Sequence, residues 1–489
     1  MIAIGYDIGS SFVKAALVDD QTGKSIARAR VPEIEIPIEA QASGWAEQDP
    51  NLWWHYLCDA TKILLTKADI SGNQISSIGI SYQMHGLVLV DQQLKALRNA
   101  IIWCDSRATP FGQKAYKNLG KDYSQAQLLN SPGNFTASKL AWVIENESAL
   151  YQKVYKFMLP GDFLAAQLSG VAQTTITGLS EGIFWDFKND QIADALFDFF
   201  KIDPAMVPDI VANFTPQASV SKAAAQATGL VEGTPITYRA GDQPNNAYTL
   251  GARSAGDVVA TGGTSGVVYA LTDQLSGVEL TKVNTFAHVD YQPNKKMFGK
   301  LLNLNGAGIQ YRWLHQLMGN IGYEQLNLSA EKAPIGSKGL SVFPFGNGAE
   351  RMLDNKIVNG HISNINFNIH NNDCMVRATL EGIAFAMVYG IEILKNDGVI
   401  IENLKVGNDN LFLSDVFSKT IADTLGIPIQ MLEATGAEGA AIASIAGLNG
   451  SENNTQSSTS KTIAPNPIAK EESLAAFEKW KNQLLKNII

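Results

Sequence analysis

The chain contains very little cysteine. Its three cysteines, Cys58, Cys104 and Cys374, have neither the spacing of a paired zinc motif nor that of a Cys-x-x-Cys redox pair. The six histidines also show no paired spacing, so a metal site built from histidine is not expected. We therefore expect free, buried thiols and no zinc-dependent or dithiol chemistry.

The chain also lacks an excess of positive charge. Its formal net charge is -9, which provides no general basic field for nucleic acid or for an acidic membrane surface. We expect neither as a partner. A phosphate-bearing ligand would have to be held by backbone amides, helix N-termini and a metal ion.

Long apolar runs are the third absence. We find no uncharged run long enough to span a bilayer, and no basic N-terminal segment followed by a long apolar stretch. The composition, 45% hydrophobic and 17% charged, is typical of a globular enzyme, and 489 residues exceed one compact core. We expect a cytoplasmic enzyme with two large domains.

Two segments about half a chain length apart share one pattern. The pattern in residues 2–18 predicts a strand (IAIGYDI), a tip of small residues (GSS) and a second strand (FVKAALV). Residues 258–273 (VVATGGTSGVVYALTD) repeat this order. The repeat predicts two homologous halves. Between them, Asp49-Pro50 begins a helical pattern, and short buried strands are predicted at 78–81 and 100–103, so an α/β architecture is expected.

The end of the chain has two further features. Residues 450–463 are polar and of low complexity, which predicts a loop or mobile segment. Residues 471–485 have the apolar spacing of a terminal helix.

The two hairpin tips are candidates for holding a polyphosphate. No G-x-x-x-x-G-K-[ST] motif is present, so a P-loop site is not expected. In the first tip Asp7 ends a strand, and Ser10 and Ser11 follow Gly9. A single tip of this kind is more often an ordinary turn in which the aspartate side chain hydrogen-bonds to the backbone of the turn. A second tip, at residues 261–266, supports the hypothesis that the two tips bind one polyphosphate from opposite sides.

Two other constellations follow predicted strands. Asp242 could accept a substrate proton from a strand end, or it could cap a helix starting near Asn245, and the residues alone favour neither. Met84 and His85, in Gln-Met-His-Gly, could contact a sugar, although a lone histidine is more often structural.

In these residues the chain resembles the FGGY carbohydrate kinases, and within them the xylulokinases. The resemblance covers roughly residues 1 to 447, with the motifs in the family's order. They are YDIGSSFVKAALVD, WAEQDPNLWW, QMHG, IIWCDSRA, FTASKLAWV, LPGDFLAAQLSG, AGDQPNNA, TGGTSGVVY, NGAGIQ and RATLEGIAF. The combination carries the argument, since each motif alone is short.

The resemblance implies an α/β fold of two actin-like, ribonuclease H-like domains with a catalytic cleft between them that closes on substrates. The implied ranges are 1–250 for an N-terminal domain with the sugar site and the first phosphate hairpin, and 251–449 for a nucleotide-binding C-terminal domain. Residues 450–489 remain as the polar loop and terminal helix. A homodimer is expected because many relatives form one.

The resemblance also implies roles for single residues. Asp242 would be the general base, and Asp7 would hold Mg2+ through water. Substrate contacts would come from Met84, His85, Asp242 and Gln243. Contacts with ATP and its phosphates would come from Ser10, Ser11, Lys14, Gly263, Thr264, Gly306, Gln310, Gly407 and Asn410.

The expected reaction is ATP-dependent phosphorylation of a small sugar, D-xylulose to D-xylulose 5-phosphate. Met84 and His85 match xylulokinases, whereas glycerol kinases have an Arg-Glu pair at that position. Another kinase of the family, acting on ribulose, a deoxy-ketose, a polyol or gluconate, is the alternative. A non-catalytic actin-like sugar sensor is a more distant one.

Overall fold

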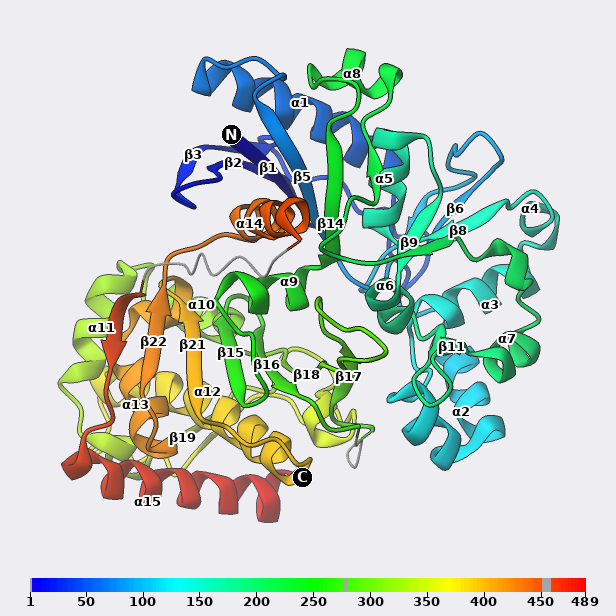
Figure 1. Cartoon of the computed structure of the whole chain (residues 1–489). Coiled ribbons are helices and arrows are strands. Elements are labelled where there is room, and N and C mark those ends of the chain that lie inside the picture. Colours follow the sequence, from blue (N-terminus) through cyan, green and yellow to red (C-terminus); the bar gives the residue numbers. More distant parts are fainter. Residues whose placement is uncertain (1, 276–279, 451–458) are drawn as a thin grey trace. The chain divides into compact units, whose positions relative to one another are not determined.

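The computed structural model describes residues 2–275, 280–450 and 459–489 (Figure 1). By packing, the chain divides into two compact units. The first comprises Met1–Gly251, Phe286–Phe298 and Ala434–Ser457, and the second comprises Ala252–Thr285, Gly299–Glu433 and Ser458–Ile489. The functional domain ranges that were predicted from the sequence stay a prediction.

The first unit is built on a six-stranded sheet in the order β13-β14-β5-β1-β2-β3. β1 pairs antiparallel with β2 and parallel with β5, and β5 pairs parallel with β14. The strands are β1 (Ile2–Ile8), β2 (Val13–Asp19), β3 (Ser25–Val31), β5 (Ile75–Tyr82), β13 (Ala218–Ser219) and β14 (Pro235–Gly241). β1 and β2 are the first predicted hairpin.

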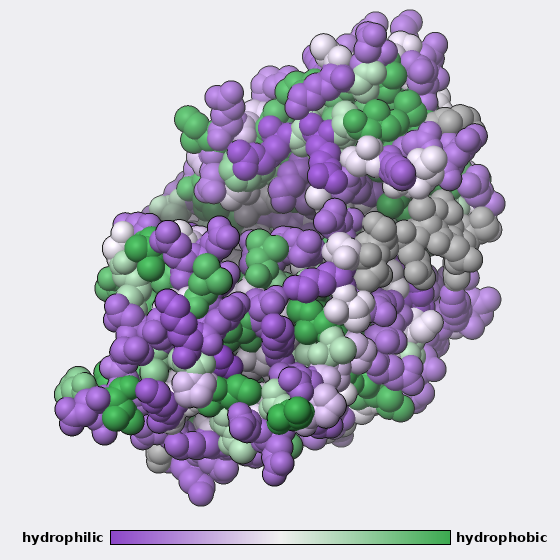
Figure 2. Space-filling view, turned by 90° about the vertical axis from the view of Figure 1, so that its left-hand side faces the viewer, coloured by the Kyte–Doolittle hydropathy of each residue, from purple (hydrophilic) through white to green (hydrophobic). Residues whose placement is uncertain are grey.

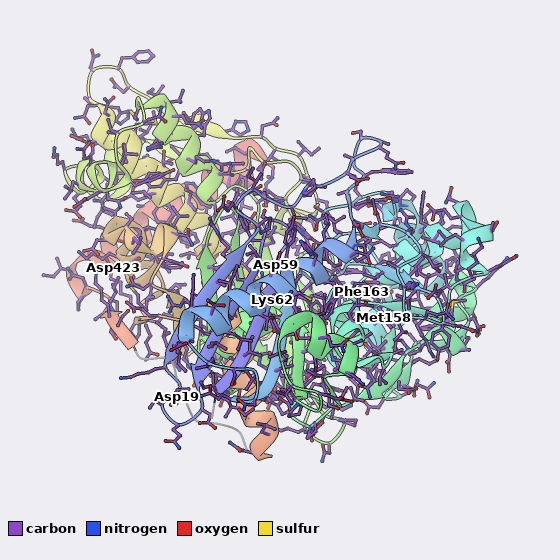
Figure 3. All side chains as sticks on the ribbon, turned by 90° about the horizontal axis from the view of Figure 1, so that it is seen from above. Asp19, Asp59, Lys62, Met158, Phe163 and Asp423 are labelled. Carbon is purple, nitrogen blue, oxygen red and sulfur yellow. The ribbon has the colours of Figure 1, made fainter. Side chains whose placement is uncertain are left out.

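Helices cover both faces of this sheet. Alternation along β1 turns Ile4 and Tyr6 toward a core shared with α1 (Pro50–Ala68) and α5 (Pro160–Ser169), and turns Ala3 toward α14 (Gly436–Asn449). Figure 1 shows α14 beside these strands. Seen from above, Asp59 and Lys62 lie on α1, and Phe163 belongs to the core beyond it (Figure 3).

Helix α1 begins where the sequence predicts it. The carboxylate of Asp49 accepts a hydrogen bond from the Asn51 backbone N–H at 2.9 Å, and Pro50 occupies the first turn, where its missing N–H is not needed. Trp53 and Leu57 point into the core.

Short elements complete the first unit. Paired strands are β4 (Glu47–Gln48) with β7 (Ala100–Ile101), β6 (Val88–Val90) with β8 (Lys156–Met158), β9 (Gln173–Thr175) with β12 (Asp209–Val211), and β10 (Trp185–Asp186) with β11 (Gln191–Ile192). The helices are α2 (Thr109–Tyr123), α3 (Thr136–Asn146), α4 (Ser148–Tyr151), α6 (Ile176–Glu181), α7 (Asp194–Phe200), α8 (Lys222–Thr228) and α9 (Asp242–Thr249).

The second unit repeats the central arrangement. Its sheet has the order β17-β18-β16-β15-β21-β22-β23, in which an antiparallel hairpin, β15 with β16, continues into the parallel strands β21 and β22. The strands are β15 (Asp257–Gly262), β16 (Gly266–Thr272), β17 (Asn284–Ala287), β18 (Phe298–Leu304), β21 (Asn403–Gly407), β22 (Ile429–Leu432) and β23 (Thr459–Ile463). The predicted second hairpin is therefore present, and the α/β fold with two similar halves is confirmed.

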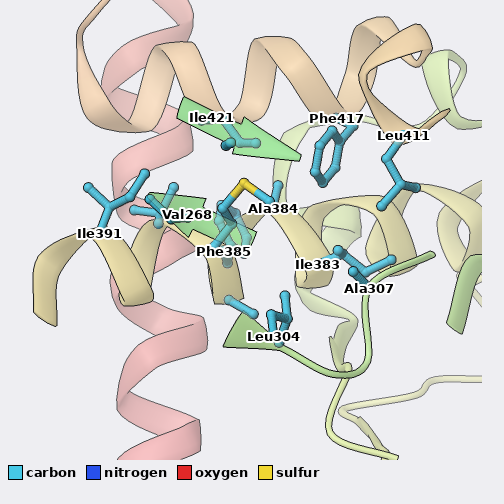
Figure 4. Packing of buried hydrophobic residues seen from close by; sticks show 14 of the residues in the cluster. Val268, Leu304, Ala307, Ile383, Ala384, Phe385, Ile391, Leu411, Phe417 and Ile421 are labelled. Carbon is cyan, nitrogen blue, oxygen red and sulfur yellow. The ribbon is translucent and has the colours of Figure 1, made fainter. Parts of the chain in front are cut away.

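The core of the second unit is built around one long apolar helix. Helix α12 (Asn372–Asn396) is long and apolar enough to cross a membrane by length and composition, although charged residues such as Arg377 and Glu381 interrupt it. However, 83% of that window is buried inside the protein. Ile383, Ala384 and Phe385 pack there against Val268 and Phe417 (Figure 4). The helix is therefore accounted for as the core of this unit.

Other helices of this unit are α10 (Gly308–Leu317), α11 (Tyr323–Glu331), α13 (Asp415–Leu425) and α15 (Pro467–Gln483), with a small sheet of β19 (Ser341–Phe343) and β20 (His361–Ser363). On the face shown in Figure 2, hydrophilic residues prevail and hydrophobic ones are scattered among them in small groups. Scattered apolar residues of this kind are normal on a protein surface.

Three expectations need comment. Of the predicted loop 450–463, residues 451–458 lie outside the described residues, but Thr459–Ile463 form β23, paired with β22, so a loop is wrong there. The terminal helix is present and begins earlier than predicted, at Pro467. Cys58 and Cys374 are free and buried as expected, whereas Cys104 is exposed.

Candidate functional site

The carboxyl ends of three parallel strands meet at one edge of the first sheet. The pairing places Ile8 of β1 opposite Tyr82 of β5, and Gly241 of β14 opposite the same tyrosine. Ligands of open α/β sheets bind beyond this edge. Asp7, the segment from Gln83 to Gly86, and Asp242 all lie here because each sits at or just past a strand end.

The side chain of Asp7, on β1, lies beside the first turn of helix α14. The Ser81 hydroxyl donates to its Oδ1 at 3.0 Å, and Lys14 Nζ is 3.7 Å from its Oδ2. A side-chain carbon on Gly436, the first residue of α14, would lie 2.9 Å from the Asp7 carboxyl carbon. The positive end of the helix dipole therefore favours negative charge at this carboxylate.

The tip of the first hairpin is fixed from outside. Gln48 donates through Nε2 to the backbone oxygen of Ser10 at 2.6 Å, and the Ile36 N–H donates to the backbone oxygen of Ser11 at 2.9 Å. Both serines are partly exposed, and the Lys14 side chain on the adjoining strand is about half exposed. The tip is thus a held loop whose small side chains remain accessible.

Asp242 is the first residue of α9, directly after β14. Helix α9 starts at Asp242 and is capped by Gly241, so the alternative in which Asp242 caps a helix near Asn245 is wrong. Burial raises the pKa of Asp242 to about 7, and the charge of Asp7 adds to this rise, while hydrogen bonds from Gln243 oppose it. The Asp242 carboxyl can therefore exchange a proton near neutral pH.

Met84 and His85 lie beside the same strand end. A side-chain carbon on Gly241 would lie 2.6 Å from Met84 Cγ, so this methionine packs against the residue preceding Asp242. His85 has a left-handed backbone, with φ of 61°, and its Nδ1 is 2.9 Å from the backbone oxygen of Glu181. Buried Lys139 donates through Nζ to the His85 backbone oxygen at 2.7 Å. The structure thus brings Met84 and His85 together with Asp242 and the adjoining Gln243.

Glu181 is a residue of this site that the sequence reasoning missed. It ends α6, is 2% exposed, and accepts a hydrogen bond from the His85 backbone N–H at 3.3 Å. No motif in the sequence marks it. Its place depends on the packing of α6 against β14, which the chain order alone does not show.

In the second unit the other hairpin tip covers the start of α10. The backbone N–H groups of Gly308 and Ile309 donate to the backbone oxygens of Gly263 and Thr264, at 2.9 and 3.1 Å. A side-chain carbon on Gly308 would overlap the Gly263 oxygen, so this close approach requires glycine. The Thr264 side chain remains exposed at the tip.

A cavity of about 660 Å³ opens beside this tip. Gly263, Thr264 and Asn410 were predicted and line it. Beneath it Leu411 joins the core of the second unit (Figure 4). The lining residues that the sequence reasoning missed come mainly from α10, α11 and the start of α13: Tyr311, Arg312, Tyr323, Glu324, Asn327, Leu328, Glu331, Ser414 and Asp415.

The remaining nucleotide candidates lie elsewhere in the second unit. Gly306 and Gln310 line a separate cavity of about 390 Å³, where the Gln310 Oε1 is buried and has no hydrogen-bond partner among the residues that the structure describes. Gly407 ends β21 and is absent from the described lining of either cavity. The polypeptide reaches the larger cavity three residues later, in the 3-10 turn Asn410–Leu413.

Within the part of the chain that the structure describes, no group of three or more His, Cys, Asp or Glu side chains could hold a metal ion. Mg2+ does not need such a group, because it keeps several waters and is usually bound through one or two carboxylates and substrate phosphates. Asp7, partly exposed and close enough to Asp242 to raise its pKa, has the chemistry to hold a hydrated Mg2+.

The chain thus has two related α/β sheets, each with a hairpin. A carboxyl group lies at the strand ends of the first sheet, and a cavity opens beside the hairpin of the second, an arrangement that suits a phosphotransferase built from two units. The sequence profiles of the FGGY family of carbohydrate kinases match the chain, the N-terminal domain over residues 2–248 and the C-terminal domain over 258–447. The chain therefore belongs to the FGGY family of carbohydrate kinases. As a carbohydrate kinase it has ATP and a sugar as its substrates.

Individual relatives agree with this assignment. The chain is 29% identical over 399 residues to the xylulose kinase of Bacillus subtilis, which covers 81% of this chain and 78% of that protein. The fold matches the crystal structure of xylulose kinase from Rhodospirillum rubrum, with a TM-score of 0.88, 22% identity and coverage of 99% and 98%. It also matches gluconate kinase from Lactobacillus acidophilus, with a TM-score of 0.87, 22% identity and coverage of 100% and 99%.

Proposed function

We propose that this kinase phosphorylates a ketopentose, converting D-xylulose to D-xylulose 5-phosphate with ATP, and that Asp242 is the general base. The similarity to proteins named xylulose kinase supports the substrate, as does the Met84-His85 pair beside the strand ends. The fold does not separate the candidate sugars, because a xylulose kinase and a gluconate kinase match it equally well.

The observation that carries the proposal is the environment of Asp242. A carboxyl group whose pKa is raised to about 7 has a proton affinity suited to taking a proton from a hydroxyl group near neutral pH. It lies next to Gly241, against which Met84 packs, so a sugar bound by Met84 and His85 would lie beside this base. Gln243 supplies an amide and a hydrogen bond that orients the Asp242 carboxyl.

The chemical step is an in-line displacement. As the C5 oxygen of the ketose forms a bond to the γ-phosphorus of ATP, its proton passes to the Asp242 carboxylate, and the bond from γ-phosphorus to the β,γ-bridging oxygen breaks to release ADP. Backbone and hydroxyl groups at the hairpin tips, Ser10 and Ser11 in one and Gly263 and Thr264 in the other, bind the phosphates, with Lys14 adding charge. Mg2+ held by Asp7 would neutralise charge on the phosphate oxygens.

The nucleotide base and ribose are assigned to the second unit. Asn410 lines the larger cavity, and Gly306 and Gln310 line the neighbouring one. Gly407 would contribute through the backbone of the loop that it begins. Because the lining of the larger cavity includes Tyr311 and Leu413 as well as polar groups, it offers both the apolar surface and the hydrogen bonds that a purine nucleoside needs.

A coupled assay of ADP release, run over a panel of sugars, tests the proposal. D-Xylulose should give the highest kcat/KM, above D-ribulose, 1-deoxy-D-xylulose, xylitol, glycerol and D-gluconate. A higher kcat/KM for any other member would replace the substrate while keeping the kinase assignment. ADP release that is the same with and without every sugar would instead favour an ATP-driven sensor. The expected homodimer is checked separately by light scattering.

A further inference from the structure

The carboxyl group of Glu181 is buried without a cationic partner, as is that of Glu350 in the second unit, among the residues that the structure describes. Most buried acids have a cationic partner: Asp162 with Arg239, Glu381 with Arg377, Glu47 with Arg98 and Arg107, and Asp397 with Lys300. Among the described residues Glu181 has no ion pair, and its Oε1 accepts only the His85 backbone N–H, at 3.3 Å. Over the described parts of the chain, its Oε2 has no hydrogen-bond partner. Since Oε2 is not among the fully enclosed unpaired atoms of the described residues, it remains accessible and can form a hydrogen bond with a ligand.

The position of Glu181 points to the acceptor sugar as that missing partner. A side-chain carbon on Gly241 would overlap Glu181 Oε2 and would lie 2.6 Å from Met84 Cγ. Oε2 therefore lies against the residue that precedes Asp242 and close to the Met84-His85 segment. The two ends of Glu181 also hold His85, since its Oε1 accepts the His85 N–H and its backbone oxygen lies 2.9 Å from Nδ1.

The surrounding charges favour the protonated form of this carboxyl. Burial is the main cause that raises the pKa of Glu181 well above its usual range, and Asp242 on α9 and Asp162 on α5 add to it. Lys139 on α3 and the His85 N–H act in the opposite direction. From β5, the buried phenol of Tyr82 also faces this group. These effects favour the protonated form of Glu181, and in that form its carboxyl group is a hydrogen-bond donor.

We propose that Glu181 is a binding residue for the acceptor sugar, whose carboxyl group donates a hydrogen bond from Oε2 to a sugar oxygen while Oε1 holds His85 in place. This inference rests on the proposed sugar-kinase function and adds a third acidic residue to Asp7 and Asp242. A keto or hydroxyl oxygen accepts such a bond. A site built to hydrogen-bond a substrate oxygen discriminates strongly, because its own polar atoms stay unpaired when that oxygen is missing.

Two substitutions separate binding from a purely structural role. Glu181→Gln keeps the shape and a donor group, and Glu181→Met keeps the length but removes every side-chain hydrogen bond while leaving the backbone contact with His85. At pH 7 we expect the KM for D-xylulose to change less than threefold in Glu181→Gln and to rise at least tenfold in Glu181→Met. The KM for ATP should stay within twofold in both. Glu381→Gln, a buried glutamate of the second unit, is the matched control and should leave the KM for D-xylulose unchanged.

The pH profile provides the decisive measurement. Ionisation removes the donor from the Glu181 carboxyl, whereas the side-chain amide of the Glu181→Gln variant keeps its donor. The ratio of the wild-type KM to the Glu181→Gln KM should therefore rise at least threefold between pH 6.5 and 9.5. A constant ratio, or a Glu181→Met enzyme with unchanged KM, would overturn the inference.

A failure of the proposed function would look different. If the wild type phosphorylates no sugar in the panel, the proposed function fails. Calorimetric binding of D-xylulose to the wild type and Glu181→Gln then tests Glu181 separately, with the same pH dependence expected for Kd.

Discussion

Gly5 in the middle of β1 and Ala437 in the first turn of α14 approach so closely that any side-chain carbon on Gly5 would overlap the Ala437 backbone oxygen. This contact joins residues more than four hundred positions apart in the chain. It seats the start of α14 on the strand that ends at Asp7, so the position of the Asp7 carboxylate depends on it. Gly79 on β5 makes a similar approach to the Ala440 oxygen.

The first prediction concerns this contact. Gly5→Ala forces α14 away from the sheet, and overpacking of this kind costs about 1–3 kcal/mol or more, since backbone cannot move aside as a side chain can. We expect a loss of at least about 3 kcal/mol in the free energy of unfolding in urea, or failure to fold. Gly322→Ala is the control, because a side-chain carbon there meets open space. Equal stability of the two variants would contradict the packing described here.

The second prediction concerns pH and stability. The folded pKa of Asp242 is raised above that of an unfolded aspartate, so its stabilising contribution is complete below about pH 4 and is lost as the pH rises through about 7. The side-chain amide of the Asp242→Asn variant cannot ionise, so this variant does not lose stability in this way. A rise of about three pKa units sets an upper limit of about 4 kcal/mol. Because Asp242 is partly accessible, we expect the variant's advantage to grow by about 1–2 kcal/mol between pH 5 and pH 8.

Urea unfolding in the presence of a chelator measures this difference without a bound metal. Asp122→Asn, at an exposed position on α2, is the control and should show the same pH dependence as the wild type. A difference between Asp242→Asn and wild type that stays constant from pH 5 to pH 8 would count against the raised pKa.

The third prediction concerns the second hairpin tip. Hydrogen bonds to charged groups contribute about 1.5–3 kcal/mol, so Thr264→Val should raise the KM for ATP by about 10- to 100-fold. The KM for D-xylulose should change less than twofold. Thr264→Ser keeps the hydroxyl and should behave like the wild type in steady-state kinetics. If Thr264→Val and Thr264→Ser had the same KM for ATP, the hydroxyl would not bind phosphate.

Much of the fold could be predicted because it is local in sequence. Asp49-Pro50 marks the start of α1, and the Gly-Ser and Gly-Thr tips mark the two hairpins. Helix α14 packs on the sheet of the first unit, although its neighbours in the chain, β22 and β23, belong to the second unit. The sequence could not predict this packing, because it depends on close contacts of Gly5 and Gly79 with a helix far away in the chain. The strand β23 was missed because its polar residues, such as Ser460 and Lys461, lack the usual apolar alternation.

The residues of the candidate site likewise comprise some that the sequence predicts and some that it does not. Asp7 and Asp242 end or follow strands within recognisable motifs, and parallel pairing then places them at one edge. Glu181 has no motif, since its role arises from the packing of α6 beside β14. Asn410 reaches the larger cavity and Gly407 is absent from its described lining, because the loop after β21 turns through a 3-10 helix before it meets the cavity.

The central claim is that Asp242 takes the proton from a sugar hydroxyl as the phosphoryl group is transferred. Phosphorus NMR of reactions with ATP, Mg2+ and D-xylulose tests it most directly. The wild type should produce ADP and the phosphomonoester of D-xylulose 5-phosphate in equal amounts. Asp242→Asn, folded and with ATP affinity within about threefold of the wild type, should lower the rate by at least about 10³-fold. Near-normal phosphoester formation by Asp242→Asn would contradict the account.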